Sequence, residues 1–220
     1  MQLRVNRFRH APWVAICAAL LAVCSAPPHA ALADERVVVC LGDSLTEGYG
    51  LAPEQSYPTL LERMLRERGH AVRVVNAGVS GSTSASAASR LRWQLRSRPD
   101  VVVIALGGND GLRGFDVAAT KANLSTAIDL AQQSGARVLL AGMKIPPNYG
   151  PEYTAAFEAV FPALAKEHGV ALLPFLLEGV AAKPDLNLPD GIHPNARGTE
   201  IVARNVLAAL LPLLAEKARP

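Results

Sequence analysis

The chain has 220 residues, of which 50% are hydrophobic and 19% charged, and it carries 22 basic and 19 acidic residues. This size and apolar content suit one domain with a full hydrophobic core. Three arginines lie within the first nine residues and no acidic residue precedes position 34, so the rest of the chain is balanced in charge. A nucleic-acid partner is therefore not expected.

The first 33 residues have the layout of a secretory signal peptide. Arginines precede an apolar run from Trp13 to Val23, and Ala31-Leu32-Ala33 supplies the small residues of a cleavage site. The run is about eleven residues long, well short of the roughly 20 that a transmembrane helix needs. We therefore expect cleavage after Ala33, a periplasmic or secreted protein made of a single domain of residues 34–220, and no stable membrane anchor.

Cysteine and histidine usage limits the chemistry further. Cys24 could anchor a lipoprotein, but the bulky Val23 stands before it where a small residue would be expected. Beyond residue 33 the only cysteine is Cys40, so no internal disulfide can form there. Its place in a Val/Leu run predicts a small buried apolar residue and not a nucleophile. The histidines in that part show no zinc-type spacing, so neither a metal nor a cofactor is expected.

Taken in chain order, short apolar segments alternate with amphipathic helical patterns. The strands are predicted at Arg36–Leu41, Val72–Val75, Val101–Leu106, Val138–Ala141 and Val170–Leu173. Helical spacing of apolar residues follows each strand, at Leu60, Leu61 and Leu65, at Leu91 and Leu95, at Leu124, Ala127 and Ile128, at Phe157, Val160 and Phe161, and at Val202, Val206 and Leu210. This alternation predicts an α/β fold with a five-stranded parallel sheet, because parallel neighbours need right-handed helical crossovers.

The first predicted strand runs into Gly42-Asp43-Ser44, which places Ser44 at the carboxyl end of the sheet, where catalytic groups collect in α/β folds. Two interpretations of Ser44 are open. Ser44-Leu45-Thr46-Glu47 fits a capping box, in which the Ser44 hydroxyl and the Glu47 carboxylate satisfy backbone N–H groups at a helix start. In the other interpretation Ser44 is a nucleophile.

Asp190 and His193 favour the nucleophile hypothesis. They lie three residues apart in an irregular stretch between the fifth strand and the last helix, so one tight turn would bring the carboxylate to the imidazole. Such a carboxylate fixes the tautomer and stabilises the imidazolium, while the other ring nitrogen takes a proton from a serine hydroxyl. His70 and His168, in contrast, lie beside glycines at predicted helix ends and are interpreted as structural.

Acyl transfer also needs hydrogen-bond donors aimed at the developing oxyanion. The backbone N–H of Ser44 is one candidate, and Gly78 and Asn109 in the turns after the second and third strands are the others. Glycine lets the backbone approach a substrate closely, and asparagine supplies a neutral amide donor. Each residue alone is equally a turn former, but their occurrence at neighbouring strand ends favours an oxyanion site.

Four segments, in order, resemble the blocks of the GDSL or SGNH hydrolase family. They are Gly42-Asp43-Ser44-Leu45, Gly78 within Asn76-Ala77-Gly78, Gly107-Gly108-Asn109-Asp110, and Asp190-Gly191-Ile192-His193-Pro194. The resemblance covers essentially all of residues 34–220. Within the family the chain resembles the group of thioesterase I, lysophospholipase L1 and arylesterase, notably in Gly107–Gly114, Pro146–Gly150 and Leu172–Phe175. The Gly-x-Ser-x-Gly signature of the α/β-hydrolases is absent around Ser44.

This resemblance implies a three-layer α/β/α, flavodoxin-like fold, a triad of Ser44, His193 and Asp190, and an oxyanion hole of Ser44, Gly78 and Asn109. It also implies two loops that flank the acyl group of a small-molecule substrate. The predicted substrate-binding residues are Ser80, Gly81, Ser82, Ile145, Pro146, Pro147 and Tyr149. Some members of the group carry an acidic residue at the position of Ser82, so their substrate preference is not transferred to this chain.

The leading hypothesis is a serine esterase that hydrolyses acyl esters and thioesters, of the arylesterase, acyl-CoA thioesterase or lysophospholipase type, through an acyl-Ser44 intermediate. A carbohydrate acetylesterase of the same family is the first alternative. A flavodoxin-like cofactor-binding module is the second, since Ser80–Ser84 at a helix start could cradle a flavin phosphate. That module would leave the pairing of Asp190 with His193 unexplained.

Overall fold

Five parallel strands form the centre of the protein in the order β2-β1-β3-β4-β5. The structure, a computed structural model, describes residue 2 and residues 35–215, so the expected signal peptide, its cleavage site and Cys24 lie outside the described residues. The strands are β1 (Arg36–Gly42), β2 (Val72–Gly78), β3 (Val101–Ala105), β4 (Arg137–Ala141) and β5 (Ala171–Leu173). The expected five-stranded parallel sheet is confirmed.

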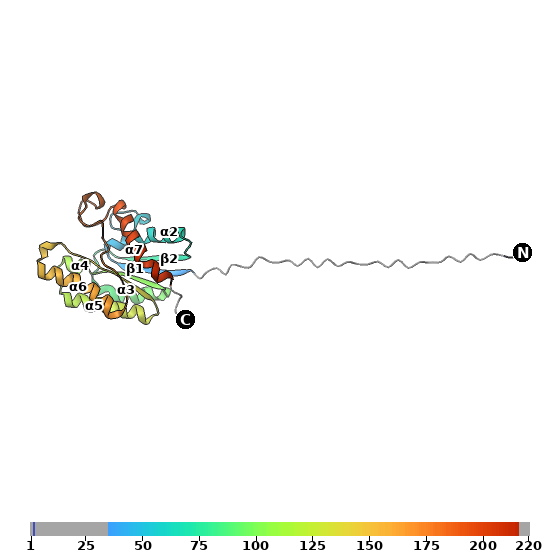
Figure 1. Cartoon of the computed structure of the whole chain (residues 1–220), viewed down its shortest axis with the longest axis horizontal. Coiled ribbons are helices and arrows are strands. Elements are labelled where there is room, and N and C mark those ends of the chain that lie inside the picture. The colour runs from blue at the N-terminus through green and yellow to red at the C-terminus, as the bar shows by residue number, and fades with distance from the viewer. Residues whose placement is uncertain (1, 3–34, 216–220) are drawn as a thin grey trace. The chain divides into compact units, whose positions relative to one another are not determined.

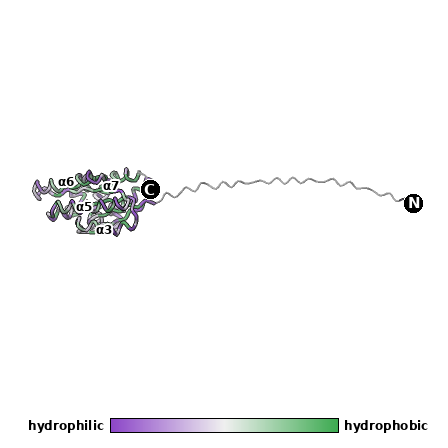
Figure 2. Tube along the Cα trace, turned by 90° about the horizontal axis from the view of Figure 1, so that it is seen from below, coloured by the Kyte–Doolittle hydropathy of each residue, from purple (hydrophilic) through white to green (hydrophobic). Residues whose placement is uncertain are grey.

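Helices cover both faces of this sheet (Figure 1). On one face α2 (Tyr57–Glu67) packs against α7 (Ala196–Ala215). On the other face α5 (Val117–Gln133) packs between α3 (Ala87–Gln94) and α6 (Pro151–His168). Hydrophobic and hydrophilic stretches follow one another along α3, α5, α6 and α7 in Figure 2, as expected where each helix buries one side. The three-layer α/β/α fold is therefore confirmed.

The strands are apolar on both sides because both sides are covered. Every residue of β3 and β4 is buried, and Val38, Val39, Cys40 and Leu41 of β1 are inaccessible to solvent. Burial raises the pKa of the Cys40 thiol to about 12. Cys40 is therefore a neutral core residue, as its place in the Val/Leu run predicts.

Among the described residues, α7 is the one helix that by length and composition alone could span a bilayer. Its apolar side is used inside the fold, where Val202, Val206 and Leu210 are buried against α2, β4 and β5. A core helix passes the same test of length and composition. The packing identifies α7 as such a helix, and it closes one layer of the fold.

Two short helices, α1 (Ser44–Glu47) and α4 (Gly108–Leu112), begin directly after β1 and β3. The sequence does not predict α4, because Gly107-Gly108-Asn109-Asp110-Gly111 has the composition of a turn. The buried Asp110 carboxylate accepts hydrogen bonds from the backbone N–H and the hydroxyl of Ser84, which fixes this turn of helix against the segment before α3. A tertiary contact therefore overrides the local propensity.

Candidate active site

The carboxyl ends of three adjacent strands meet at one edge of the sheet. Gly42 at the end of β1 is in register with Gly78 of β2 and with Ala105 of β3. Ser44 is the first residue of α1 and Asn109 the second residue of α4, so both lie just beyond this edge. The convergence of the polar turns, which the alternation of strands and helices predicts, is present.

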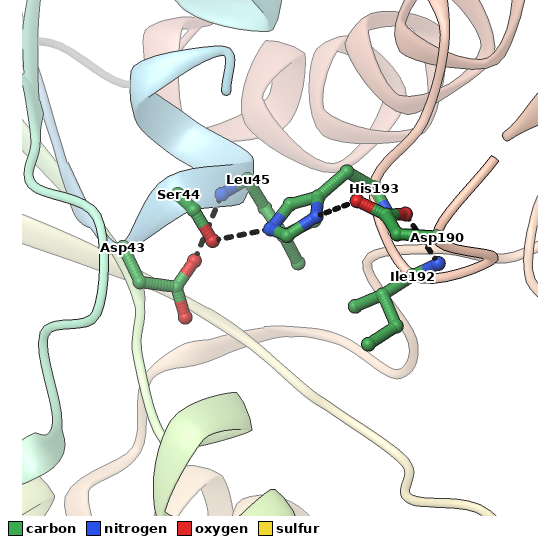
Figure 3. A network of polar contacts seen from close by, with 6 residues as sticks. All are labelled: Asp43, Ser44, Leu45, Asp190, Ile192 and His193. Carbon is green, nitrogen blue, oxygen red and sulfur yellow. Dashed lines mark hydrogen bonds and ion pairs between the residues drawn. The ribbon is translucent and has the colours of Figure 1, made fainter. Parts of the chain in front are cut away.

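Ser44, His193 and Asp190 form one chain of hydrogen bonds (Figure 3). The Nε2 atom of His193 lies 2.9 Å from Ser44 Oγ, and its Nδ1 atom lies 2.8 Å from Asp190 Oδ2. The other carboxylate oxygen of Asp190 accepts the backbone N–H groups of Ile192 and His193, at 2.9 and 3.0 Å. The turn 190–193 thus holds the carboxylate in the orientation that the imidazole needs.

These contacts decide the charge of Asp190. The backbone N–H of His193 is the largest cause that lowers the pKa of Asp190, to about 2, and the Ile192 N–H and the His193 ring act in the same direction. The carboxylate is therefore ionised at neutral pH. An ionised partner at Nδ1 favours the tautomer in which Nε2 accepts the hydroxyl proton of Ser44.

The Ser44 hydroxyl does not cap α1. Asp43 is the N-cap residue, and its Oδ1 atom accepts the Leu45 N–H at 3.0 Å. Glu47, the other half of the expected capping box, instead accepts hydrogen bonds from the backbone N–H of Ser80, at 2.7 Å, and from the Ser80 hydroxyl. The capping-box interpretation is wrong, and the hydroxyl of Ser44 forms a hydrogen bond with His193 instead.

Ser44 and Asn109, which carry two of the three expected oxyanion donors, both line the cavity beside His193. The Ser44 N–H has no hydrogen-bond acceptor within the described part of the chain. The amide of Asn109 donates to the backbone oxygen of Ser82 at 3.0 Å and lies 3.5 Å from Asp43 Oδ2. A substrate oxygen at this point would meet the unused Ser44 N–H, and the Asn109 amide would exchange its 3.5 Å contact with Asp43 Oδ2 for that oxygen.

The third expected donor, Gly78, is directed elsewhere. Its N–H donates to Asn76 Oδ1 at 3.0 Å, and a Cβ atom at Gly78 would overlap the backbone of Glu47 in α1. Gly78 is needed for the close packing of β2 against α1, so the structure does not bring its N–H into the site. Gly81, three residues further on, has φ 75° and an N–H without an acceptor among residues 35–215.

A cavity of about 540 Å³ opens beside Ser44, Asn109 and His193. Its walls are mainly apolar, and its lining includes Leu45, Leu112, Met143, Ile145, Pro146, Pro147, Phe175, Leu177 and Ile192. A cavity of this size, with a few polar groups at one point, is typical of small-molecule sites. It can bury the apolar part of a substrate while leaving a carbonyl group at Ser44.

The structure places only part of the predicted substrate loops at this cavity. Ile145, Pro146 and Pro147 line it. Tyr149 does not, and its hydroxyl donates to the Leu112 backbone oxygen at 2.7 Å, which anchors the loop. Ser80, Gly81 and Ser82 also lie outside the lining, and their loop is tied to Glu47, Asn109 and Arg113.

Two lining residues, Phe175 and Leu177, are not expected from the sequence. They follow β5, whose carboxyl end lies at the same edge of the sheet as those of β1 and β3. That position is the signal that could have identified them, but apolar residues after a strand resemble core residues. Among residues 35–215, no group of three or more His, Cys, Asp or Glu side chains is placed to hold a metal ion.

Comparison with known proteins identifies the family. Residues 40–201 match the model of the GDSL-like lipase/acylhydrolase family. The chain belongs to this family. The GDSL relatives include the esterase TesA of Pseudomonas aeruginosa, which is 43% identical over 180 residues, covering 81% of this chain and 90% of that protein. They also include the thioesterase 1/protease 1/lysophospholipase L1 of Escherichia coli K12, at 40% identity over 84% of this chain and 87% of that protein.

A solved structure agrees with the GDSL assignment. The psychrotrophic esterase EstA from Pseudoalteromonas sp., inhibited by monoethylphosphonate, superposes with a TM-score of 0.78 at 32% identity. The match covers 83% of this chain and 100% of that one. The family resemblance and the SGNH hydrolase fold that the four sequence blocks predict are thus confirmed, and the chain is a GDSL-family hydrolase.

Proposed function

We propose that this carboxylic ester hydrolase acts through a covalent acyl-Ser44 intermediate, with His193 as general base and Asp190 as its orienting partner. The observation that supports this most directly is the hydrogen-bonded chain from Asp190 to His193 to Ser44, at 2.8 and 2.9 Å. Nothing further has to move before the hydroxyl proton passes to Nε2.

The proposed reaction has two halves. As Ser44 Oγ attacks the acyl carbon, its proton moves to His193 Nε2, and the ionised Asp190 stabilises the imidazolium. That proton then passes to the leaving alcohol or thiol when its bond to the acyl carbon breaks. A water molecule, deprotonated by the same Nε2 atom, attacks the acyl-Ser44 ester, and the carboxylic acid leaves as the proton returns to Ser44.

For the oxyanion, we propose the Ser44 N–H and the Asn109 amide, with the Gly81 N–H in place of that of Gly78. The Gly78 donor is used by Asn76, whereas the Gly81 donor has no acceptor among the described residues. The turn that carries Gly81 is bonded to Asn109 through the Ser82 carbonyl, so the two donors lie in contacting segments.

We further propose esters and thioesters with an apolar acyl or aryl group as substrates, and a periplasmic or secreted location after removal of residues 1–33. The cavity beside Ser44 is lined mainly by apolar side chains, and relatives at about 40% identity are named esterase, thioesterase and lysophospholipase. The alternative of a flavin-binding module has no support from the family, whose members are named lipases and acylhydrolases.

The acyl-enzyme is tested with a fluorophosphonate probe followed by peptide mass spectrometry. We expect a single modified residue, Ser44, and no labelling of Ser44→Ala, whose kcat should be lower by about 10⁴-fold or more while the protein stays folded. Ser89, an exposed serine of α3 whose hydroxyl donates to the Ser86 carbonyl, offers a control variant, Ser89→Ala, that should still be labelled at Ser44. Labelling at any other serine would overturn the mechanism.

The carbohydrate acetylesterase alternative is tested with p-nitrophenyl esters of increasing acyl length. Each methylene group that enters an apolar cavity contributes about 0.8 kcal/mol, which corresponds to a rise in kcat/KM of about fourfold. We expect kcat/KM to rise from acetate to hexanoate. A strict preference for acetate would favour the acetylesterase instead.

A further inference from the structure

Tyr49 contacts the face of the His193 ring, and no step of the proposed reaction uses it. The two ring centroids lie 4.5 Å apart and the ring planes are tilted by 37°. This distance is at the short end of the range for aromatic pairs. Tyr49 is nevertheless 51% exposed, and its hydroxyl makes no hydrogen bond to the described residues. The contact with His193 is therefore made by the ring face and not by the phenol oxygen.

The position of Tyr49 is fixed by the same turn that ends the helix carrying Ser44. The N–H groups of Gly48 and Tyr49 both donate to the Ser44 carbonyl, at 3.0 Å each. Gly48 and Gly50 on either side have φ values of 92° and 74°, which side chains other than glycine rarely adopt. The backbone of Tyr49 is thus tied to that of Ser44, and the Tyr49 ring and the Ser44 hydroxyl both meet the His193 imidazole.

His193 itself comes from a loop, so its ring orientation has to be imposed from outside. The hydrogen bonds at Nδ1 and Nε2 lie in the plane of the imidazole and hold its two nitrogen atoms, but they support neither face of the ring. The Tyr49 ring packs on one face and limits tilting of the imidazole out of these hydrogen bonds. Its electron-rich face also attracts the positive charge that the imidazole gains when it takes the proton of Ser44.

We infer that Tyr49 is a positioning residue of the catalytic histidine, which holds the His193 plane for proton transfer and stabilises the imidazolium through its ring face. This inference rests on the proposed function, since it concerns the same proton transfer. Tyr49 is absent from the lining of the 540 Å³ cavity. Its contribution therefore belongs to the chemical step and not to the binding of the acyl group.

The test compares Tyr49→Phe and Tyr49→Leu. Phenylalanine keeps the ring face and removes only the unbonded hydroxyl, so kcat should stay within about twofold of the wild-type value. Leucine keeps the apolar bulk and removes the face, so kcat should fall by about fivefold while KM stays within twofold. Trp93→Leu is the matched control, because Trp93 is an exposed aromatic residue on α3 whose ring contacts Arg96, and it should behave as wild type.

A spectroscopic measurement reads the contact without any substrate. The ring current of Tyr49 should move a ring-proton resonance of His193 to higher field in the wild type and in Tyr49→Phe, but not in Tyr49→Leu. Absence of this difference would show that the rings do not meet in solution and would overturn the inference. So would a kcat of wild-type size in Tyr49→Leu, a loss confined to KM, or equal losses in both variants.

The two proposals can fail separately. Hydrolysis that persists in Ser44→Ala would overturn the proposed function and this inference with it. Hydrolysis that depends on Ser44 but is unchanged in Tyr49→Leu would overturn the role of Tyr49 alone.

Discussion

Asp43 shows how one buried side chain can serve the site at the expense of stability. It is 2% exposed, caps α1 through the Leu45 N–H and lies within 3.5 Å of the Asn109 amide. Burial is the largest cause acting on it and raises the pKa of its carboxyl to about 6, against the opposing effects of the Leu45 N–H and of His193. At neutral pH Asp43 is therefore ionised at a buried position that disfavours its negative charge.

This raised pKa predicts how stability depends on pH. Below about pH 4 the carboxyl is protonated in both the folded and the unfolded chain, so its titration does not change the free energy of unfolding. Between about pH 4 and 6 the unfolded chain loses the proton first, so stability falls as pH rises, by about 3 kcal/mol in total. We therefore expect Asp43→Asn to unfold at higher urea concentration than the wild type at pH 8, and at a similar concentration at pH 4.

Asp43→Asn should also reduce activity. If the asparagine oxygen keeps the Leu45 N–H, an amide nitrogen replaces Asp43 Oδ2 and no longer accepts a hydrogen bond from the Asn109 side chain. A fall in kcat of about tenfold is expected at pH 8. Asp116→Asn is the matched control. Asp116 caps α5 by accepting the Ala118 N–H at 2.9 Å, as Asp43 caps α1, but Asp116 is exposed. If Asp43→Asn were less stable than the wild type at pH 8, burial of a charge would not be the dominant effect at this position.

At the scale of elements, α4 connects the oxyanion side of the site to the wall of the cavity. A Cβ atom at Gly111 in α4 would lie 2.5 Å from Ile145 Cγ2 and 2.8 Å from Phe157 Cζ. Ile145 lines the cavity and Phe157 is a fully buried residue of α6. There is no room here for one further methyl group unless both side chains shift.

We expect Gly111→Ala to lower the free energy of unfolding by about 2 kcal/mol through overpacking, and to raise KM for longer acyl esters by displacing Ile145. Gly108→Ala in the same helix is the control, because the nearest atoms to its added Cβ lie at 3.5 to 3.7 Å, an ordinary contact distance. Urea unfolding of both variants separates crowding from a general effect of alanine in α4. Equal stabilities of the two would contradict the packing argument.

The elements also show what a sequence can and cannot disclose. Strands such as Val101–Ala105 are predictable because both faces are covered, which leaves a continuous apolar run. The hydrogen bond between Asp190 and His193 is predictable because the two residues lie three positions apart. The choice between Gly78 and Gly81 as donor is not, because it depends on whether the Asn76 side chain turns back onto the backbone.

On the scale of the whole molecule, the start of β1 is joined to elements far away in the sequence. The Glu35 carboxylate pairs with Arg66 at 3.1 Å, and the Arg36 guanidinium donates to the Leu214 carbonyl at 2.6 Å, joining the start of β1 to the end of α7. The Val37 N–H donates to the Asp100 carboxylate at 2.8 Å. These contacts join the start of β1 to α2, to α7 and to the turn before β3.

A chain that begins at Asp34 is therefore expected to fold as the full chain does, with the same melting temperature and a kcat/KM within about twofold. A chain that begins at Val38 is the control. It lacks the Arg36 and Val37 contacts and two pairs of the β1–β2 ladder, and it should be less stable by about 2 kcal/mol or more. Thermal unfolding of the full chain and of the two shortened chains measures these differences in stability.

A lower melting temperature for the chain starting at Asp34 than for the full chain would mean that the first 33 residues contribute to the fold. It would argue against a signal peptide that is removed.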